Sequence, residues 1–514
     1  MFEPTTPFPE GCLIARSCHS KCSENLYCNV LNASDQDLIL TKNQVIGNLS
    51  IVETVDEKFD REVKEYTPLD IHKLLYNPGK TFSSTPTANK QAKPPELSTS
   101  DIYQHQIKRD ISALKVGKHL TQIQRDMLSK VLLKNQKAFL WDAKEIGRTK
   151  LIEHTIPTGN HEPIHQKQYP IPSVARERME QQIDEMLKNK FIRPSSSPWR
   201  SPVLLVKKKL PDGTIKYRFC IDLKKVNSVT TKDSYSLPRI SETVEALSGA
   251  KYFTTMDVDR AFWQIGVAEP DKRKTAFIIG GKLYEFNVMQ FGSMNASSTF
   301  QRLMDRVLRG LTWRQCLVYI DDVLIFSSSF EKHMKDIDEV LSRFILAGLK
   351  LKPSKCSFAD NEVDYLGFKI TNTGVQITTK KIDAILNITP PDTAKHLFQF
   401  LCSINYYRSL IPNFGRITTD LYQMAQAKKK NCTWDTKSLK QFADLKQALV
   451  TAPILAFPNF SLPFYIQTDA SQNEVGGVLL QKEDKLFKPI SFASRKLSDT
   501  EKRYSATESI QHFF

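Results

Sequence analysis

The sequence predicts an α+β protein of several domains, and three changes of pattern along the chain support this. Between residues 203 and 370, short apolar strands alternate with helical segments. Residues 380–450 are mostly helical, with interruptions at Pro390, Pro391 and Pro412, and residues 463–497 return to strands. A chain of 514 residues favours roughly three domains.

The composition is that of an ordinary globular protein with an excess of positive charge. Apolar residues make up 40% and charged residues 25%, which excludes a collagen or a globally disordered chain. No apolar run approaches the ~20 residues of a membrane span, and the N-terminus lacks a secretory signal pattern. Nine cysteines, an odd number, favour a reducing compartment, and the net charge of +16 favours a polyanionic partner. We therefore expect an intracellular protein, cytoplasmic or nuclear, with no membrane partner.

The first ~55 residues are predicted to form short strands. Residues 26–31 and 38–40 are apolar runs separated by a polar turn. A zinc site is the less favoured interpretation of four nearby cysteines, because no two of them are spaced as Cys-x2-Cys: Cys12, Cys18, Cys22 and Cys28. Residues 76–100 are rich in Pro, Ser, Thr and Lys, which is typical of a linker.

Apolar residues at helical spacing predict two helices next. The first ends near Phe139, and its apolar residues are Ile123, Met127, Val131 and Leu132. The second covers residues 173–190 with Ser173 as its N-cap, and its apolar residues are Met179, Ile183, Met186 and Leu187.

A basic β-hairpin follows these helices. The turn 211–213, Pro-Asp-Gly, lies between the apolar runs 203–206 and 217–221. From Lys190 to Lys225 there are ten basic residues and two acidic ones, a local charge of +8. Such a hairpin either binds the phosphates of a nucleotide or template, or is a solvated basic face.

The strongest chemical signal is a pair of adjacent acids between two apolar strands. Asp321 and Asp322 follow Tyr319 and Ile320, with apolar residues on either side. This pattern predicts a tight hairpin with carboxylates at its tip, where like charges repel and favour a compensating cation such as Mg²⁺. The alternative is a solvated turn between two strands.

A second apolar strand, residues 251–256, ends at Asp257. One acid from this strand and one from the hairpin could bridge two metal ions, the arrangement used for phosphoryl transfer. Asp259 is expected to be an exposed acid and not a ligand.

In order and spacing, these elements resemble the reverse transcriptase of gypsy-class LTR retrotransposons. The basic hairpin resembles the fingers, and Phe253–Val258 with Ala261–Ile265 resembles the first palm motif. Met289–Ala296 with Thr299–Met304 resembles the helix that positions template and nucleotide. Residues 348–368 resemble the last palm strand and the primer grip, and residues 464–497 resemble the opening strands of an RNase H domain.

The resemblance implies an RNA-directed DNA polymerase, and it implies roles for individual residues. The catalytic acids would be Asp257, Asp321 and Asp322, with Val258 beside them at a site for Mg²⁺ or Mn²⁺. Lys355 is a weaker candidate for a proton donor to pyrophosphate. The nucleotide-binding residues would be Lys208, Arg218, Phe262 (the gate under the sugar 2′ position), Phe291 and Gly292. The partners would be dNTPs and an RNA or DNA template with its primer.

The resemblance also implies a right-hand polymerase with fingers, a ferredoxin-like palm and a thumb, followed by a partial RNase H-like α/β domain. The expected divisions are a β-rich spacer at 1–56, a flexible linker at 57–102, a helical lead-in at 103–150, fingers and palm at 151–375, thumb and connection at 376–455, and the RNase H-like part at 456–514. Of the four RNase H acids, only two have positions here, Asp469 and Glu508, so we expect a truncated domain that does not cleave RNA.

The chain departs from the family's usual pattern at three places. Gln290 stands where the family usually has Pro, Ser297 likewise replaces a usual Pro, and Lys224 stands where Arg is common. The intact acids favour a polymerase. The alternative is a decayed or domesticated element that binds nucleic acid without catalysis.

Overall fold

The computed structural model describes residues 2–4, 12–14, 30–32, 47–49, 114–141, 146–170, 173–209, 215–427, 430–483, 486–505 and 508. The chain divides into two compact units, Met1–Thr85 and Pro86–Phe514. None of the helices in these described stretches is long and apolar enough to cross a membrane.

The first unit contains two strand pairs. Strand β1 (Phe2–Pro4) pairs with β4 (Gly47–Leu49), and β2 (Cys12–Ile14) pairs with β3 (Val30–Asn32). The apolar run predicted at 26–31 therefore overlaps β3 only at its end. The run 38–40, the linker 76–100 and the three cysteines after Cys12 lie outside the described residues.

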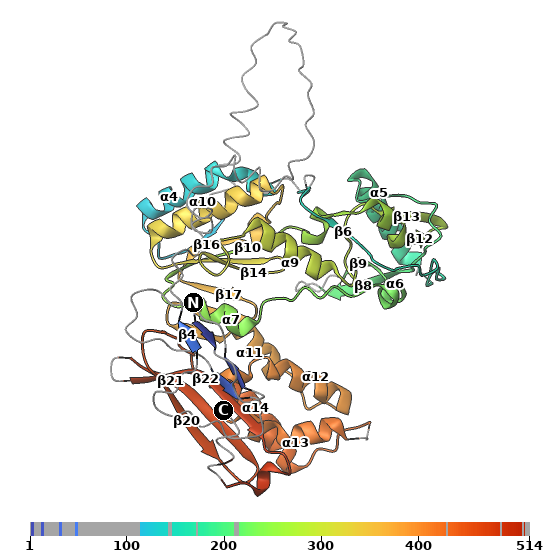
Figure 1. Cartoon of the computed structure of the whole chain (residues 1–514). Helices are drawn as coiled ribbons and strands as arrows, with labels where there is room; N and C mark the ends of the chain where they lie inside the picture. The colour runs from blue at the N-terminus through green and yellow to red at the C-terminus, as the bar shows by residue number, and fades with distance from the viewer. Residues whose placement is uncertain are drawn as a thin grey trace. The chain divides into compact units, whose positions relative to one another are not determined.

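The second unit is organised around a five-stranded sheet, called the central sheet here (Figure 1). Its strand order is β14-β15-β10-β16-β5. The middle strand, β10, is antiparallel to both of its neighbours. Its strands are β5 (Lys115–Val116), β10 (Tyr252–Asp257), β14 (Cys316–Tyr319), β15 (Asp322–Ser327) and β16 (Ser357–Asp360).

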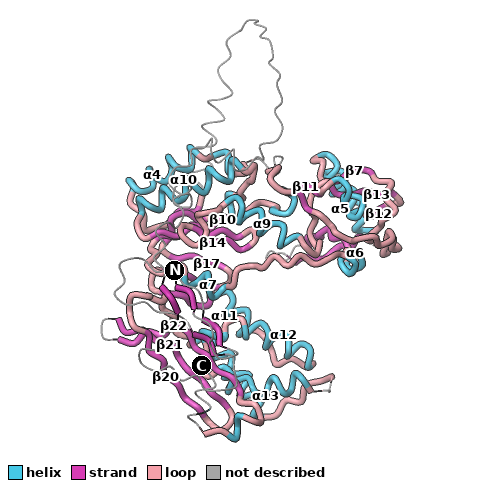
Figure 2. The backbone as a smooth tube through the Cα atoms, in the orientation of Figure 1, coloured by secondary structure: helices cyan, strands magenta, loops and turns pink. Residues whose placement is uncertain are grey.

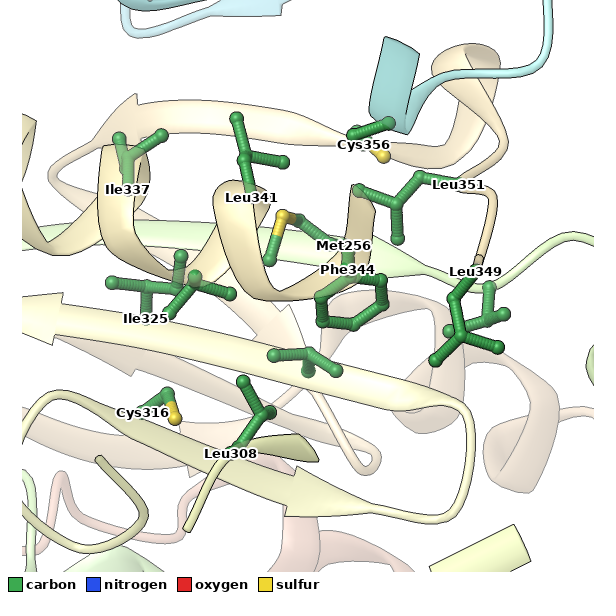
Figure 3. Packing of buried hydrophobic residues seen from close by; sticks show 14 of the residues in the cluster. Met256, Leu308, Cys316, Ile325, Ile337, Leu341, Phe344, Leu349, Leu351 and Cys356 are labelled. Atoms are coloured by element: carbon green, nitrogen blue, oxygen red, sulfur yellow. The ribbon is translucent and has the colours of Figure 1, made fainter. Parts of the chain in front are cut away.

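Three helices bury the apolar residues of one face of this sheet: α4 (Gln122–Lys134), α9 (Ala296–Val307) and α10 (Phe330–Leu346). Figure 3 shows Met256 and Ile325 of the strands among Ile337, Leu341 and Phe344 of α10. Because these residues are almost fully buried, the hydrophobic effect fixes the face that β10 turns toward the helices.

The helix predicted before Phe139 exists, and its predicted apolar residues are confirmed in part, since Leu132 is buried and Val131 packs against the core. Ile123 is 74% exposed, whereas Leu128 and Leu132 are buried in the core. Successive helix positions differ by about 100°, so a one-residue shift in the chosen stripe selects another face. The helix ends at Lys134 and is followed by the short 3-10 helix η1 (Gln136–Ala138).

A separate hydrophobic cluster holds the region predicted as fingers. Helix α5 (Ser173–Lys188) buries Met179, Ile183 and Met186, as expected. The predicted hairpin consists of β8 (Val203–Lys209) and β9 (Ile215–Ile221). The same region contains β7 (Ile192–Pro194), α6 (Lys224–Val229), α8 (Glu269–Lys272), η3 (Arg273–Thr275), β12 (Phe277–Ile279) and β13 (Lys282–Phe286).

Short elements connect these parts. They are β6 (Glu153–His154), α7 (Ile240–Glu245), η2 (Ala261–Gln264), β11 (Gly266–Val267) and η4 (Pro353–Lys355). A three-stranded antiparallel sheet follows the central sheet in sequence: β17 (Glu362–Tyr365), β18 (Phe368–Thr371) and β19 (Gly374–Ile377).

The helical region predicted at 380–450 is confirmed, and α12 and α13 lie side by side in it (Figure 2). Its elements are α11 (Thr379–Leu386), α12 (Ala394–Asn405), η5 (Arg408–Leu410), α13 (Phe414–Gln426) and α14 (Thr436–Val450). The three strands that follow form an antiparallel meander: β20 (Phe464–Ala470), β21 (Glu474–Glu483) and β22 (Leu486–Lys496).

Ser498 followed by Glu501 is a capping pattern that predicts a helix beginning near Ser498. The capping hydrogen bonds between Ser498 and Glu501 do form, but the 3-10 turn η6 (Glu501–Arg503) follows in place of a helix start. Glu508 is helical, and the residues beside it lie outside the described residues. Arg495 binds the Glu501 carboxylate through two hydrogen bonds of 2.9 and 2.7 Å. This ties the turn to β22, and the backbone returns to an extended conformation at Tyr504.

Candidate active site

Two of the predicted catalytic acids are direct neighbours across adjacent strands. Asp257 is the last residue of β10, and its Cα partner on β15 is Asp322. Asp321 lies in the turn between β14 and β15, and its carbonyl accepts a hydrogen bond from the amide of Val258. The structure thus brings Asp257 and Asp322 together at the ends of adjacent strands, whereas their shared role in binding metal with Asp321 stays a prediction.

The environment of Asp321 and Asp322 disfavours their charged forms. Desolvation by the surrounding protein atoms raises the pKa of Asp322 to about 6, with smaller contributions from the negative charges of Asp321 and Asp257. Desolvation also raises the pKa of Asp321, with a further contribution from Asp257. Like charges placed directly opposite one another on a sheet are destabilising. The cluster therefore stores electrostatic repulsion that a cation would relieve.

Lys355 supplies one such positive charge. Its ammonium lies 2.7 Å from Oδ2 of Asp257. Burial lowers the pKa of Lys355, but the hydrogen bond to Asp257 and the charges of all three acids outweigh this, so its pKa is raised. Lys355 is thus a protonated side chain within reach of the candidate catalytic acids.

The donor set at this edge fits a hard divalent cation. Carboxylate oxygens are the ligands that Mg²⁺ prefers, and the three acids carry more negative charge than Lys355 balances. Among the described residues, no group of three or more His, Cys, Asp or Glu side chains is arranged to hold a metal ion in this conformation. The residues that would hold the ion are Asp257, Asp321 and Asp322, with Val258 beside them.

The turn that carries Asp321 is strained, and a residue missed by the sequence analysis holds it in place. Ile320 has φ +56°, a left-handed conformation that β-branched residues rarely adopt. Its amide donates a 2.8 Å hydrogen bond to Oε1 of the fully buried Gln301 on α9. The Gln301 amide donates to Asp305 Oδ1 at 3.0 Å, and the Tyr235 hydroxyl donates to Asp305 Oδ2 at 2.5 Å.

The expectation that Asp259 is exposed is wrong, since it is only 6% exposed. Its carboxylate oxygens lie 3.9 Å from the side-chain nitrogens of both Arg260 and Lys352. The Gln264 amide donates to the carbonyls of Asp259 and Lys350, at 2.5 and 2.9 Å. Lys352 is far away in sequence, so the local pattern alone could not reveal this burial.

The structure brings together two of the predicted nucleotide-site residues. The ring centroids of Phe262 and Phe291 are 5.2 Å apart, and Phe262 also contacts Phe300 of α9 at 6.0 Å. Phe291 is 58% exposed, whereas Phe262 is half-buried. Phe262 therefore has its ring packed on one side, as a gate would need.

Residues 290–295, called the nucleotide loop here, contain Phe291 and Gly292. Gly292 has φ +90°, which favours glycine. The Asn227 side chain donates to the Gly292 carbonyl at 2.9 Å and accepts from the Met294 amide at 3.0 Å. Gln290 is buried, and its carboxamide has no hydrogen-bond partner among the described residues. Nothing in the structure explains this substitution.

Lys208 and Arg218 lie on the two strands of the basic hairpin, where Lys208 pairs with Lys216 and Arg218 with Val206. Their side chains lie outside the described residues. Their assignment to the triphosphate stays a prediction.

The second acidic site, in the C-terminal strands, is built differently. Asp469 lies near the end of β20, is exposed, and has Gly476 as its strand partner. The carboxylate of Glu508 accepts a 2.7 Å hydrogen bond from the amide of Ser505. The assignment of Asp469 and Glu508 to a partial RNase H site stays a prediction.

Two protein-family models match parts of the chain that contain these acids. The family model described as "Reverse transcriptase (RNA-dependent DNA polymerase)" matches residues 206–370. A second model, "RNase H-like domain found in reverse transcriptase", matches residues 434–510. The first match includes the three candidate catalytic acids, and the second includes Asp469 and Glu508.

Curated relatives include Pol polyproteins of Drosophila melanogaster transposons. The chain is 39% identical to that of transposon opus over 368 residues, which cover 70% of this chain and 37% of the relative. For transposon 297 the identity is 37%, covering 81% of this chain and 39% of the relative. For transposon gypsy it is 34%, covering 73% and 37%. The chain thus spans about two fifths of the length of these relatives.

Solved structures with the same fold include the foamy viral protease-reverse transcriptase. Its complex with double-stranded DNA aligns with a TM-score of 0.69 at 26% identity, covering 82% of this chain and 72% of that one. Its complex with an RNA/DNA hybrid aligns with a TM-score of 0.67 at 25% identity, covering 82% and 56%.

Proposed function

Because the chain carries a reverse transcriptase domain and an RNase H-like domain related to those of LTR-retrotransposon Pol polyproteins, we propose that it is an RNA-directed DNA polymerase. Its substrates would be dNTPs and the 3′-hydroxyl of a primer paired to an RNA or DNA template. The observation that carries the proposal is the cross-strand pairing of Asp257 with Asp322, beside Asp321 in a strained turn.

The acids are suited to bind divalent cations during this reaction. Asp257, Asp321 and Asp322 are held at one edge of a buried sheet, and their mutual repulsion is relieved when a cation binds. When bound, Mg²⁺ would activate the primer 3′-hydroxyl and stabilise the leaving pyrophosphate.

Other residues would orient the nucleotide and the proton. The Phe262 ring, packed against Phe291 and Phe300, would fill the space that a ribose 2′-hydroxyl needs. Lys355 holds a proton next to Asp257, in a position to neutralise charge on the departing pyrophosphate. The basic hairpin would hold the triphosphate and the template phosphates.

Primer extension on poly(rA)/oligo(dT) with Mg²⁺ tests the proposal. The purified chain should extend the primer, and Asp321→Asn should reduce extension by at least about a thousandfold, because catalysis depends on groups that hold the transition state. Binding of the primer–template should stay nearly unchanged in the variant.

Two results would contradict the proposal. Undiminished extension by Asp321→Asn would remove the two-metal assignment. Tight binding of primer–template by the wild-type chain without extension would instead indicate an element that binds nucleic acid without polymerising.

A further inference from the structure

His154 is a fully buried histidine of β6, and its ring contacts the nucleotide loop. Its Nε2 lies 2.8 Å from the hydroxyl oxygen of Ser293, in the loop. Its Nδ1 lies 3.0 Å from the hydroxyl oxygen of Thr299, on α9. His154 therefore links the loop to the helix that follows it, through one rigid ring.

The loop is also fixed at its other contacts. The segment before it is bound next to β11, since the amide of Met289 donates at 2.9 Å to the carbonyl of Ile265, the residue that precedes β11. Asn227 bridges Gly292 and Met294 from the side of α6. Asn295 donates to the Thr231 carbonyl at 2.9 Å and accepts from the Asp233 amide at 3.0 Å. Of these contacts, the one made by His154 is a hydrogen bond to Ser293, the residue that follows Gly292.

We propose that His154 is a positioning residue for the incoming nucleotide. Its hydrogen bond to Ser293 holds the nucleotide loop in the conformation in which Phe291 and Gly292 contact the substrate. The inference rests on the proposed function and extends it to a residue outside the matched reverse transcriptase region, 206–370. His154 acts through Ser293 and the loop, and it does not itself reach the reacting atoms.

The chemistry of a neutral imidazole suits this task. Burial lowers the pKa of His154 to about 4, against an opposing effect of Asp271, so the ring is neutral at physiological pH. A neutral ring donates from one nitrogen and accepts at the other, and the two hydroxyls can supply the complementary roles. Because the ring is flat and rigid, it fixes the distance between Ser293 and Thr299 in a way that a flexible side chain does not.

The chain offers a matched control in His333. This second histidine is also fully buried and also lies between two hydroxyls, Thr254 Oγ1 at 2.8 Å and Ser327 Oγ at 2.9 Å. It lies in the first turn of α10, and within the described residues its two ring nitrogens bond to β10 and β15 of the central sheet and not to the nucleotide loop. Replacing either histidine with phenylalanine removes the same kind of hydrogen bonds from the same depth of burial.

The test measures steady-state primer extension, primer–template affinity and thermal unfolding for wild type, His154→Phe, His154→Gln, Ser293→Ala and His333→Phe. His154→Phe should raise KM for dNTP by about tenfold, the effect of losing one or two hydrogen bonds. Its kcat and its Kd for primer–template should stay within about twofold of wild type. His154→Gln, which keeps a donor and an acceptor, should recover part of the KM.

Ser293→Ala should raise KM in the same direction, and combining it with His154→Phe should add little, since both remove the same link. His333→Phe should lower the unfolding midpoint without raising KM for dNTP. An unchanged KM in a folded His154→Phe chain, or an equal rise in His333→Phe, would overturn the inference. A wild-type chain that does not extend primers would remove the proposed function, and the inference with it.

Discussion

Asp257 is the last residue of β10 and Asp469 is the residue before the last of β20, and the surroundings of these two acids differ sharply. Asp257 on β10 faces Asp322 across the strand register, has Lys355 at 2.7 Å, and lies against a core of three helices. Asp469 on β20 faces Gly476, and its side chain is exposed. The local sequence pattern, an apolar strand followed by an acid, is the same in both.

This comparison shows that the environment, more than the residue type, sets the chemistry of an acid. Beside Asp257, desolvation and like charges disfavour the ionised states of Asp321 and Asp322, which creates a demand for a cation. Asp469 has a glycine, Gly476, as its partner on the neighbouring strand, so β21 places no second acid opposite it. We therefore expect polymerisation to depend on the first site and to be insensitive to the second.

The largest effect on catalysis is expected from removing the hydrogen bond between Gln301 and the strained turn at Ile320. In Gln301→Leu the amide of Ile320 loses its partner, and the turn that carries Asp321 can relax toward an ordinary conformation. Because small misplacements of catalytic groups are costly, kcat for primer extension should fall by about a hundredfold. Tyr235→Phe, which removes only the more distant hydrogen bond to Asp305, should have a much smaller effect.

Thermal unfolding and primer–template binding serve as controls for this pair. If Gln301→Leu is folded and retains wild-type kcat, the strained turn does not matter for catalysis.

A smaller effect is expected from the aromatic wall beside the acids. Phe262→Val should let ribonucleotides enter, because bulk at this position excludes the 2′-hydroxyl by shape. The ratio of rNTP to dNTP incorporation, measured as kcat/KM for each, should rise by about tenfold or more, the scale of a missing steric contact. Phe262→Tyr keeps the bulk and should keep the selectivity. An unchanged ratio in Phe262→Val would show that Phe262 is only a core residue.

The smallest effect is on stability, and its direction follows from the pKa of Asp322. The pKa is raised from 3.8 to about 6, so the folded state binds this proton more tightly than the unfolded state does. The stability that Asp322 contributes to the folded state is greatest below about pH 4 and is lost as the pH rises through about 6. Asp322→Asn has no such loss, so without Mg²⁺ it should unfold at a higher temperature than wild type at pH 7.5, by about 2 °C.

This difference should shrink at pH 4.5, and it should also shrink when Mg²⁺ stabilises the wild-type chain. Asp469→Asn, which removes an exposed carboxylate of β20, is the control, and its unfolding midpoint at pH 7.5 should match wild type. A gap of the opposite sign at pH 7.5 would show that the three acids do not repel one another in the folded state.

Much of the fold could be predicted from periodicity and turn chemistry. The pairing of β8 with β9, the acidic hairpin at 321–322 and the helical region at 380–450 all follow from local patterns that the structure confirms, whereas the turn 211–213 lies outside the described residues. Local patterns failed where a distant residue decides the outcome. Asp259 is buried by contacts that include Lys352, which is far away in sequence.

The supporting residues of the candidate site were not predictable in the same way. Gln301 and His154 lie within a helix and a short strand, and nothing in their own neighbourhood sets them apart from ordinary polar residues. Their contacts join positions 19 and 139 residues away in sequence, Ile320 and Ser293. A polar residue on the otherwise apolar face of α9 was the one signal that could have identified Gln301, since a fully buried carboxamide needs hydrogen-bond partners.

The central claim is that the acids of the central sheet hold the divalent cation and that Asp469 does not. Metal-directed cleavage tests it directly: Fe²⁺ replaces Mg²⁺ on the chain bound to primer–template, and peroxide then breaks the backbone next to the metal. We predict cleavage near residues 257 and 320–322, suppressed by excess Mg²⁺ and absent in Asp321→Asn, with none near residue 469. Cleavage near residue 469 alone, or cleavage near residues 320–322 that persists in Asp321→Asn, would contradict the account.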